Sequence, residues 1–454
     1  MTKIIFLKKD VLPLLKLSIP LVLTSFMQGS LGFFENIFLA HLGQQVLAAG
    51  ALVAWLFATL IVILFGTFSS VNILIAHKYG AKDNPGITHV FRDGLVLALF
   101  LVVPTFLLLW YTPPIFLLFG QSPALVKLAT AYLHALAWSL FPKFILIVLF
   151  EFLLGLGRTR VLTVFTVFSL PFYLLFSYVL IFGKFGFPAL GIAGAGWGMV
   201  LGDWLATTAL GLYVFFNQHY QCYLKSLFTF TRPTYLWELL HLGVPMGLMY
   251  CVEVGFFFSI TLFMGVMGVQ TLAANQLAMQ YLGPLMGMIF SLAQGVTIRM
   301  GHQLGAEQPA SAERTAFAGL LLGALFMSLI AITYWSFPYA LIAIDFNVHL
   351  AENEETVYFA KQFLFIAAFF QLFESARVML FGALRSLKDT RFTLLVSILS
   401  FWCIALPLGY MFAHYIQLGG AGFWWGMVIG ASCSAPVLYS RFRLKMKSYH
   451  TAID

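Results

Sequence analysis

The chain has 454 residues, of which 61% are hydrophobic and 9% are charged, and its mean hydropathy is +0.93. Soluble domains carry about 25% charged residues, so this composition excludes an ordinary water-soluble enzyme or binding module. The net charge of +8 does not indicate a nucleic-acid partner, because the basic residues lie in connections between apolar runs and are typical of topology signals. We therefore expect a polytopic protein whose main partner is the lipid bilayer.

Apolar runs separated by turn signals predict an all-α protein with twelve transmembrane helices. Each run is long enough to cross a hydrocarbon layer of about 30 Å as a helix. In chain order, the predicted spans are residues 12–39, 47–76, 92–116, 127–156, 161–183, 191–216, 235–264, 271–300, 314–344, 357–384, 392–414 and 419–440.

The connections between these spans alternate in charge. One side carries 20 of the 25 Lys and Arg residues, Lys3, Lys225 and Arg441 among them. The positive-inside rule places this side, with both termini, in the cytoplasm. An even number of spans also requires that the termini share a side. We expect a multi-pass membrane protein.

The sequence repeats itself after about 225 residues. The segment VNILIAHKYGAK (71–82) matches VTIRMGHQLGAE (296–307), and LGIAGAGWGMVLG (190–202) matches LGGAGFWWGMVIG (418–430) at an offset of 228. We therefore predict two pseudo-symmetric six-helix lobes, residues 1–216 and 235–454, joined by a cytoplasmic linker at 217–234. Duplicated halves with a site at their interface are the architecture of alternating-access transporters, so a carrier is favoured over a channel.

Two carboxylates lie deep within predicted spans, where an ionisable group requires a partner or a function. Glu253 lies about 27 Å along the seventh helix at 1.5 Å per residue, and Glu374 lies at a similar depth in the tenth. Two like charges at one depth share a proton or a cation. Arg377, three residues after Glu374 on the same helix face, is a competing partner that would make Glu374 structural. In the aligned first half, Gln28 faces Glu253 and Ile147 faces Glu374, so this acidic pair belongs to the second half alone.

Other carboxylates within spans have simpler interpretations. Glu151 is near the cytoplasmic end of its span and fits a structural role. Asp203 fits an ion pair with Lys143. Glu35 is a further acidic residue within the first span.

Taken together, PMGLMYCVEVGFFFSITLFMG, VTIRMGHQLGA, FGKFGFPALGIAGAGWG (182–198) and GALRSLKDTR (382–391) resemble the multidrug and toxic compound extrusion (MATE) family, most closely its NorM-like bacterial branch. The resemblance covers essentially all twelve spans and implies a multi-pass protein of a bacterial inner (plasma) membrane. It implies an antiporter that exports organic, often cationic and aromatic, compounds in exchange for H⁺ or Na⁺, with no other cofactor. The acidic residues of the family fall on Glu253, on Glu374 and, in FFENIFLAHLG, on Glu35.

The sequence departs from the NorM-like pattern where a metal ion would need ligands. Tyr173 and Ser177 replace an asparagine pair, and Phe370 replaces a tyrosine. Hard cations need several oxygen ligands, so protons are favoured over Na⁺, although Na⁺ at Glu253 and Glu374 stays open. We expect these two residues to couple transport to the cation. Candidates for the substrate or a second acidic site are Glu35, Tyr173, Ser177, Gln28, Phe370 and Arg377.

The residues within the spans argue against two alternatives to a drug exporter. A flippase for an anionic lipid-linked substrate would concentrate basic residues in the spans, but only Lys143 and Arg377 lie there, against at least three carboxylates. An intramembrane enzyme would need a catalytic or metal motif, and none is found. A monomeric exporter of hydrophobic organic cations is therefore expected.

Overall fold

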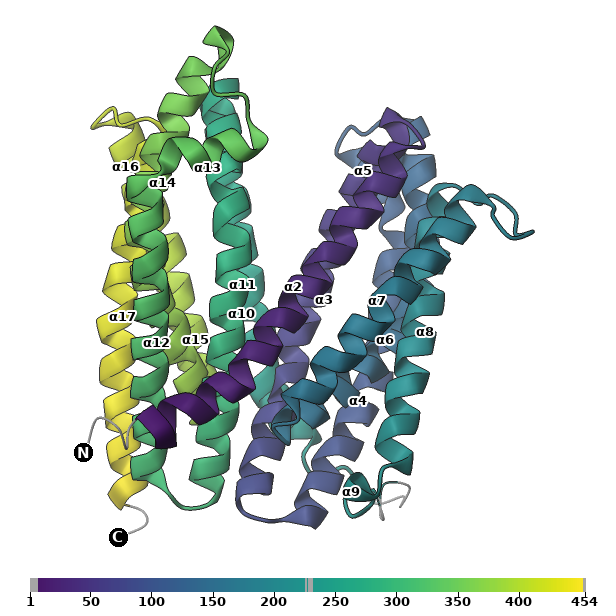
Figure 1. Cartoon of the computed structure of the whole chain (residues 1–454), viewed down its shortest axis with the longest axis vertical. Helices are drawn as coiled ribbons and strands as arrows, with labels where there is room; N and C mark the ends of the chain where they lie inside the picture. The colour runs from purple at the N-terminus through teal and green to yellow at the C-terminus, as the bar shows by residue number, and fades with distance from the viewer. Residues whose placement is uncertain (1–6, 225–226, 228–231, 452–454) are drawn as a thin grey trace. The chain divides into compact units, whose positions relative to one another are not determined.

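The computed structural model describes residues 7–224, 227 and 232–451, and within these residues it is helical and without strands (Figure 1). Lys3, Lys225 and part of the predicted 217–234 linker lie outside the described residues. The elements are η1 (Leu7–Val11), α2 (Leu12–Ala40), α3 (Gln44–Gly80), α4 (Asn84–Tyr111), α5 (Pro113–Leu118), α6 (Pro123–Gly155), α7 (Thr159–Phe182), α8 (Ile192–Phe216), α9 (Gln218–Gln221), α10 (Leu236–Met267), α11 (Val269–Gly305), α12 (Pro309–Ser336), α13 (Pro338–Asp345), η2 (Ala351–Asn353), α14 (Glu354–Ser386), α15 (Thr390–Ser397), η3 (Ile398–Ala405), α16 (Leu406–His414) and α17 (Gly420–Thr451).

The prediction of twelve spans is confirmed, because twelve helical segments among the described residues are long and apolar enough to cross a membrane. Eleven of them contain one long helix each. The remaining span, Thr390–His414, consists of α15, η3 and α16. Its wide π-helical turn, η3, ends just before Pro407. A proline has no N–H to donate and clashes with the preceding helical turn, which explains the local departure from α-helix.

The chain divides into two compact units. The first-half unit is Leu23–Gly243, and the second-half unit contains the chain up to Val22 together with the chain from Val244 onward. These bounds differ from the expected 1–216 and 235–454, because the start of α2 and the start of α10 each belong to the unit of the other half. Within the second-half unit, Asp10 pairs with Arg314 of α12 at 3.4 Å.

The start of α10 is bound to the first-half unit by a polar contact, as the start of α2 is to the second-half unit. The backbone N–H of Tyr235 donates to the Asp93 carboxylate of α4 at 2.7 Å. Asp93 is fully buried and also pairs with Arg92 at 3.0 Å. Polar contacts at the helix start thus explain why each unit boundary falls inside a long helix and not in a loop.

The helix bounds and contacts show which residues of the two halves are equivalent more precisely than the sequence does. The bounds of α4 and α12 are offset by 225 residues, those of α6 and α14 by 231, and the starts of α8 and α17 by 228. Asn72 donates to Glu151 in one half. At the matching positions of the other half, the Thr297 hydroxyl donates to the Gly382 carbonyl at 2.8 Å.

The offset of 231 residues between α6 and α14 corrects one prediction. The residue of the first half that is equivalent to Glu374 is Lys143, and the alignment of Glu374 with Ile147 was wrong. The cause is an insertion of six residues in the second half, because α13 is two residues longer than α5 and the loop after it is eight residues long, whereas the loop after α5 has four. Apolar helices match one another in several registers, so the sequence did not locate this insertion.

Candidate functional site

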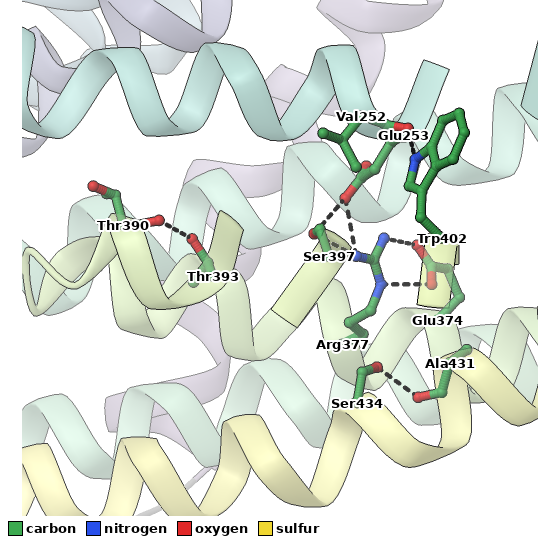
Figure 2. Close-up of polar contacts among 10 residues, drawn as sticks. All are labelled: Val252, Glu253, Glu374, Arg377, Thr390, Thr393, Ser397, Trp402, Ala431 and Ser434. Carbon is green, nitrogen blue, oxygen red and sulfur yellow. Dashed lines mark hydrogen bonds and ion pairs between the residues drawn. The ribbon is translucent and has the colours of Figure 1, made fainter. Parts of the chain in front are cut away.

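A buried ion cluster in the second-half unit is built around Arg377 of α14, whose side chain is fully buried (Figure 2). Its Nε donates to Oε2 of Glu374 at 2.7 Å, and its Nη2 donates to the other oxygen of the same carboxylate. Its Nη1 donates to Oε1 of Glu253, on α10, at 2.9 Å. The predicted acidic pair is therefore brought together, and the arginine binds both of its members. We call Glu253, Glu374 and Arg377 the Arg377 cluster.

The span that contains η3 completes the surroundings of the guanidinium group. The Ser397 hydroxyl accepts from Nη1 of Arg377 and donates to Oε1 of Glu253, each at 3.2 Å. The ring of Phe401 lies 4.5 Å from the guanidinium carbon, and that of Phe381 lies 4.6 Å from it. Ser397, at the end of α15, and Phe401, in η3, thus contact the guanidinium group from this span, whereas Phe381 lies on α14 itself. Stacking on aromatic rings and paired hydrogen bonds to carboxylates are the contacts for which arginine is best suited.

This arrangement limits what the Arg377 cluster can bind. Both oxygens of Glu374 accept from the guanidinium group, and Oε1 of Glu253 accepts from Arg377 and from Ser397. A sodium ion would have to compete with these donors for its oxygen ligands. Because arginine stays protonated in proteins, the cluster holds two carboxylates against one fixed positive charge.

A second buried cluster lies in the first-half unit. Lys143 of α6 places its Nζ 3.0 Å from Oδ1 of Asp203, on α8, which confirms the expected ion pair. The hydroxyl of Tyr173, on α7, donates to the same oxygen at 2.6 Å. Glu35, on α2, is 9% exposed and within electrostatic reach of Lys143 and Asp203. We call these four residues the Lys143 cluster, and it too holds two carboxylates against one base.

Close packing between α7 and α8 fixes the position of Tyr173. A Cβ atom on Gly202 would lie 2.2 Å from Cδ1 of Tyr173, and one on Gly198 would lie 2.5 Å from the Ser177 backbone. Only glycine allows α8 to approach α7 this closely. The tyrosine ring therefore packs directly against Gly202, and its hydroxyl reaches Asp203, the next residue of α8.

The remaining candidates from the sequence are distributed differently. Ser177 is buried one turn from Tyr173, and its hydroxyl has no hydrogen-bond partner among the residues that the structure describes. Gln28 is exposed. Phe370 is fully buried in the apolar core of the second-half unit, with the Phe257 ring at 6.4 Å. Of the residues expected at the second site, Tyr173 and Ser177 lie one turn apart on α7, and Glu35 is within electrostatic reach of Tyr173.

Sequence reasoning did not place Asp203 in a common cluster with Glu35. The corrected alignment of the two halves contains a pattern that could have placed these two residues together. At the matching positions of the second half, Asp203 corresponds to Ala431 and Glu35 corresponds to Ile260. Polar residues that one half carries and the other replaces by buried apolar residues are candidates for a shared site.

Comparison with known proteins agrees with this architecture. The family model described as MatE matches residues 20–179 and 245–411, one segment in each half. The chain belongs to the MATE family. It is 33% identical over 95% of its length to a probable multidrug resistance protein NorM of Pseudomonas aeruginosa, covering 89% of that protein. It is 32% identical over 96% of its length to the Pseudomonas putida protein of the same name, covering 94% of it.

Solved structures show that this chain has the MATE fold. A multidrug resistance MATE family transporter in an outward-facing conformation matches with a TM-score of 0.87 at 20% identity, with 98% of each chain covered. A eukaryotic MATE transporter matches with a TM-score of 0.83 at 20% identity, with 99% of this chain and 100% of that chain covered. The MATE protein described here is thus a multi-pass membrane transporter and not an enzyme.

Proposed function

We propose that this MATE transporter is a multidrug efflux protein that exports hydrophobic organic cations in exchange for protons. Its relatives in two Pseudomonas species carry the name probable multidrug resistance protein NorM, which supports drug efflux. The exchange partner and the charge of the substrate are inferred from the buried ionisable groups.

One observation carries the proposal: each unit contains a buried cluster with one more carboxylate than base. In the second-half unit, Glu253 and Glu374 share Arg377. In the first-half unit, Lys143 pairs with Asp203, and Glu35 lies within electrostatic reach of both. An excess negative charge at low dielectric constant strongly favours the binding of a proton or a cation, and it disfavours an anion. Each cluster can therefore alternate between a protonated form and a form that holds a substrate cation.

The hydrogen bonds favour protons over sodium as the exchanged ion. A proton needs one free carboxylate lone pair, whereas a sodium ion needs several oxygens at once. In the Arg377 cluster, three of the four carboxylate oxygens already accept from Arg377. In the Lys143 cluster, Oδ1 of Asp203 accepts from Tyr173 and pairs with Lys143. Oδ2 of Asp203 and Oε1 of Glu35 have no hydrogen-bond partner among the described residues, so the preference for protons rests on the Arg377 cluster.

We also propose that the protein is a monomer of the inner membrane with both termini in the cytoplasm. The two ends of the described chain lie at the same end of the second-half unit, because both contact the start of α12. Asp10 pairs with Arg314, and Arg443 of α17 pairs with Glu313. The large share of basic residues on this side supports a cytoplasmic location.

The proposed exchange can be tested with purified protein in liposomes that contain ethidium, a fluorescent monovalent cation. A proton gradient and a sodium gradient are imposed in separate experiments at zero membrane potential. We expect ethidium flux in response to the proton gradient at equal sodium concentrations. The control is the same protein with Glu35→Gln and Glu374→Gln combined. Flux that follows the sodium gradient and ignores the proton gradient would reassign the exchanged ion.

A further inference from the structure

The Lys143 cluster contains its own cation. Nζ of Lys143 lies 3.0 Å from Oδ1 of Asp203, and this oxygen also accepts from Tyr173 at 2.6 Å. Asp203 is fully buried, whereas the Lys143 side chain keeps 16% of its surface exposed. The ammonium group lies 5.9 Å from the centre of the Phe57 ring of α3, a second favourable contact for a cation. One carboxylate of the cluster is therefore neutralised by the protein itself.

The other carboxylate is not neutralised in this way. The charged groups that act on Glu35 are Lys143 of α6 and Asp203 of α8. The phenol groups of Tyr132 and Tyr173, on α6 and α7, also reach it and carry no charge at neutral pH. With Glu35 ionised, the cluster carries two negative charges and one positive charge, hence a net charge of minus one.

We propose that Lys143 fixes at one the number of positive charges that the first-half unit exchanges in each transport cycle, and thereby makes this unit selective for monovalent cations. The inference rests on the proposed exchange of protons for organic cations. One monovalent substrate brings the cluster to neutrality. When it leaves, one proton on Glu35 restores the same neutrality, so charge balances at every step. A divalent substrate would leave an uncompensated positive charge in the interior of the unit.

Two substitutions should change this charge count in opposite directions. Lys143→Gln leaves both Glu35 and Asp203 without a base, so the cluster has a charge of minus two and reaches neutrality with one divalent substrate, which exchanges for two protons. A monovalent substrate still exchanges for one proton there, because the other proton stays bound. Asp203→Asn leaves Glu35 and Lys143 as a balanced pair, so the cluster binds neither a substrate cation nor a proton. A salt bridge with a purely structural role would instead make both variants defective in the same way.

The charge count can be measured in liposomes with an imposed proton gradient, at zero membrane potential, with ethidium or divalent methyl viologen as the substrate. A gradient of about one pH unit is worth about 1.4 kcal/mol for each proton exchanged, which sustains about a tenfold substrate gradient for one proton and about a hundredfold gradient for two. The wild-type protein should export ethidium and not methyl viologen. Lys143→Gln should export methyl viologen as well, with about a hundredfold gradient, and Asp203→Asn should lose ethidium export through this unit.

Three controls separate charge from folding. Lys143→Arg keeps the charge and should keep the wild-type preference for ethidium over methyl viologen. Lys184→Gln removes an exposed lysine of the same unit and should have no effect. The double variant Lys143→Gln with Asp203→Asn keeps a net charge of minus one and should return to the wild-type preference, even if either single variant folds poorly.

The outcomes distinguish this inference from the proposed function on which it rests. If the wild-type protein ignores an imposed proton gradient, the proposed exchange itself is wrong. If it exchanges protons but Lys143→Gln gains no export of methyl viologen, or Asp203→Asn leaves ethidium export unchanged, only the role of Lys143 is refuted.

Discussion

Replacing Arg377 by methionine should destabilise the second-half unit severely. The guanidinium group donates four hydrogen bonds, to Glu253, Glu374 and Ser397. The Glu253 side chain is 8% exposed and that of Glu374 is 2% exposed, so the substitution leaves two carboxylates buried without a counter-ion. Removing one partner of a buried ion pair costs about 3–5 kcal/mol. For a unit of this size, that corresponds to a fall in the unfolding temperature of about 10 °C.

The assay is the loss of monodisperse protein on heating in detergent, followed by size-exclusion chromatography. The matched control is Arg441→Met. Arg441 is 36% exposed and pairs with Asp389 at 2.7 Å, so its removal should cost about 1 kcal/mol or less. A triple variant, Arg377→Met with Glu253→Gln and Glu374→Gln, removes every charge of the cluster and should recover most of the lost stability. The reasoning is refuted if Arg377→Met unfolds no earlier than Arg441→Met, or if the triple variant is no more stable than Arg377→Met.

The remaining predictions concern a helix cap, a close helix contact and the acidic pair. Asp83 caps the first turn of α4, and a nearby lysine holds the pKa of its carboxyl below the usual value of 3.8. Asp83→Ala should cost about 1 kcal/mol at neutral pH. This difference in unfolding temperature should vanish as the pH falls through the lowered pKa. Gly202→Ala should displace Tyr173 and reduce ethidium export in liposomes more than it reduces the unfolding temperature. Glu253→Gln and Glu374→Gln should each abolish export driven by a proton gradient while the protein remains monodisperse; full export by both would assign the pair a structural role.

The number and order of the spans followed from the sequence, because lipid imposes a long apolar run on every crossing helix. The ends of the helices did not. α3 covers Gln44–Gly80, whereas its hydropathy predicted only 47–76. Its last turn contains polar residues such as Lys78, which continue the helix beyond the apolar run. A hydropathy pattern reports the part of a helix that lies in lipid and does not report where its hydrogen bonds end.

The candidate site was predictable in its parts but not in its connections. The spacing of Glu374 and Arg377 on one helix showed that they could pair. The bond from Arg377 to Glu253 joins residues 124 positions apart, and it depends on how α10 packs against α14. Likewise, Asp203 was recognised as a partner of Lys143, but its place beside Glu35 depends on tertiary packing. Sequence patterns identify costly buried charges, whereas the contacts decide which of them neutralise one another.

The two clusters have the same net charge, but their charged residues do not lie at equivalent positions of the two halves. Lys143 and Glu374 are equivalent in the corrected register and carry opposite charges. Glu35 lies seven residues beyond Gln28, the equivalent of Glu253, which is about 10 Å farther along the first helix of its half. If the site had been duplicated together with the helices, its charged residues would lie at equivalent positions in both halves. What the halves share instead is an excess of one carboxylate over one base, and this excess determines how many cations a buried site can exchange.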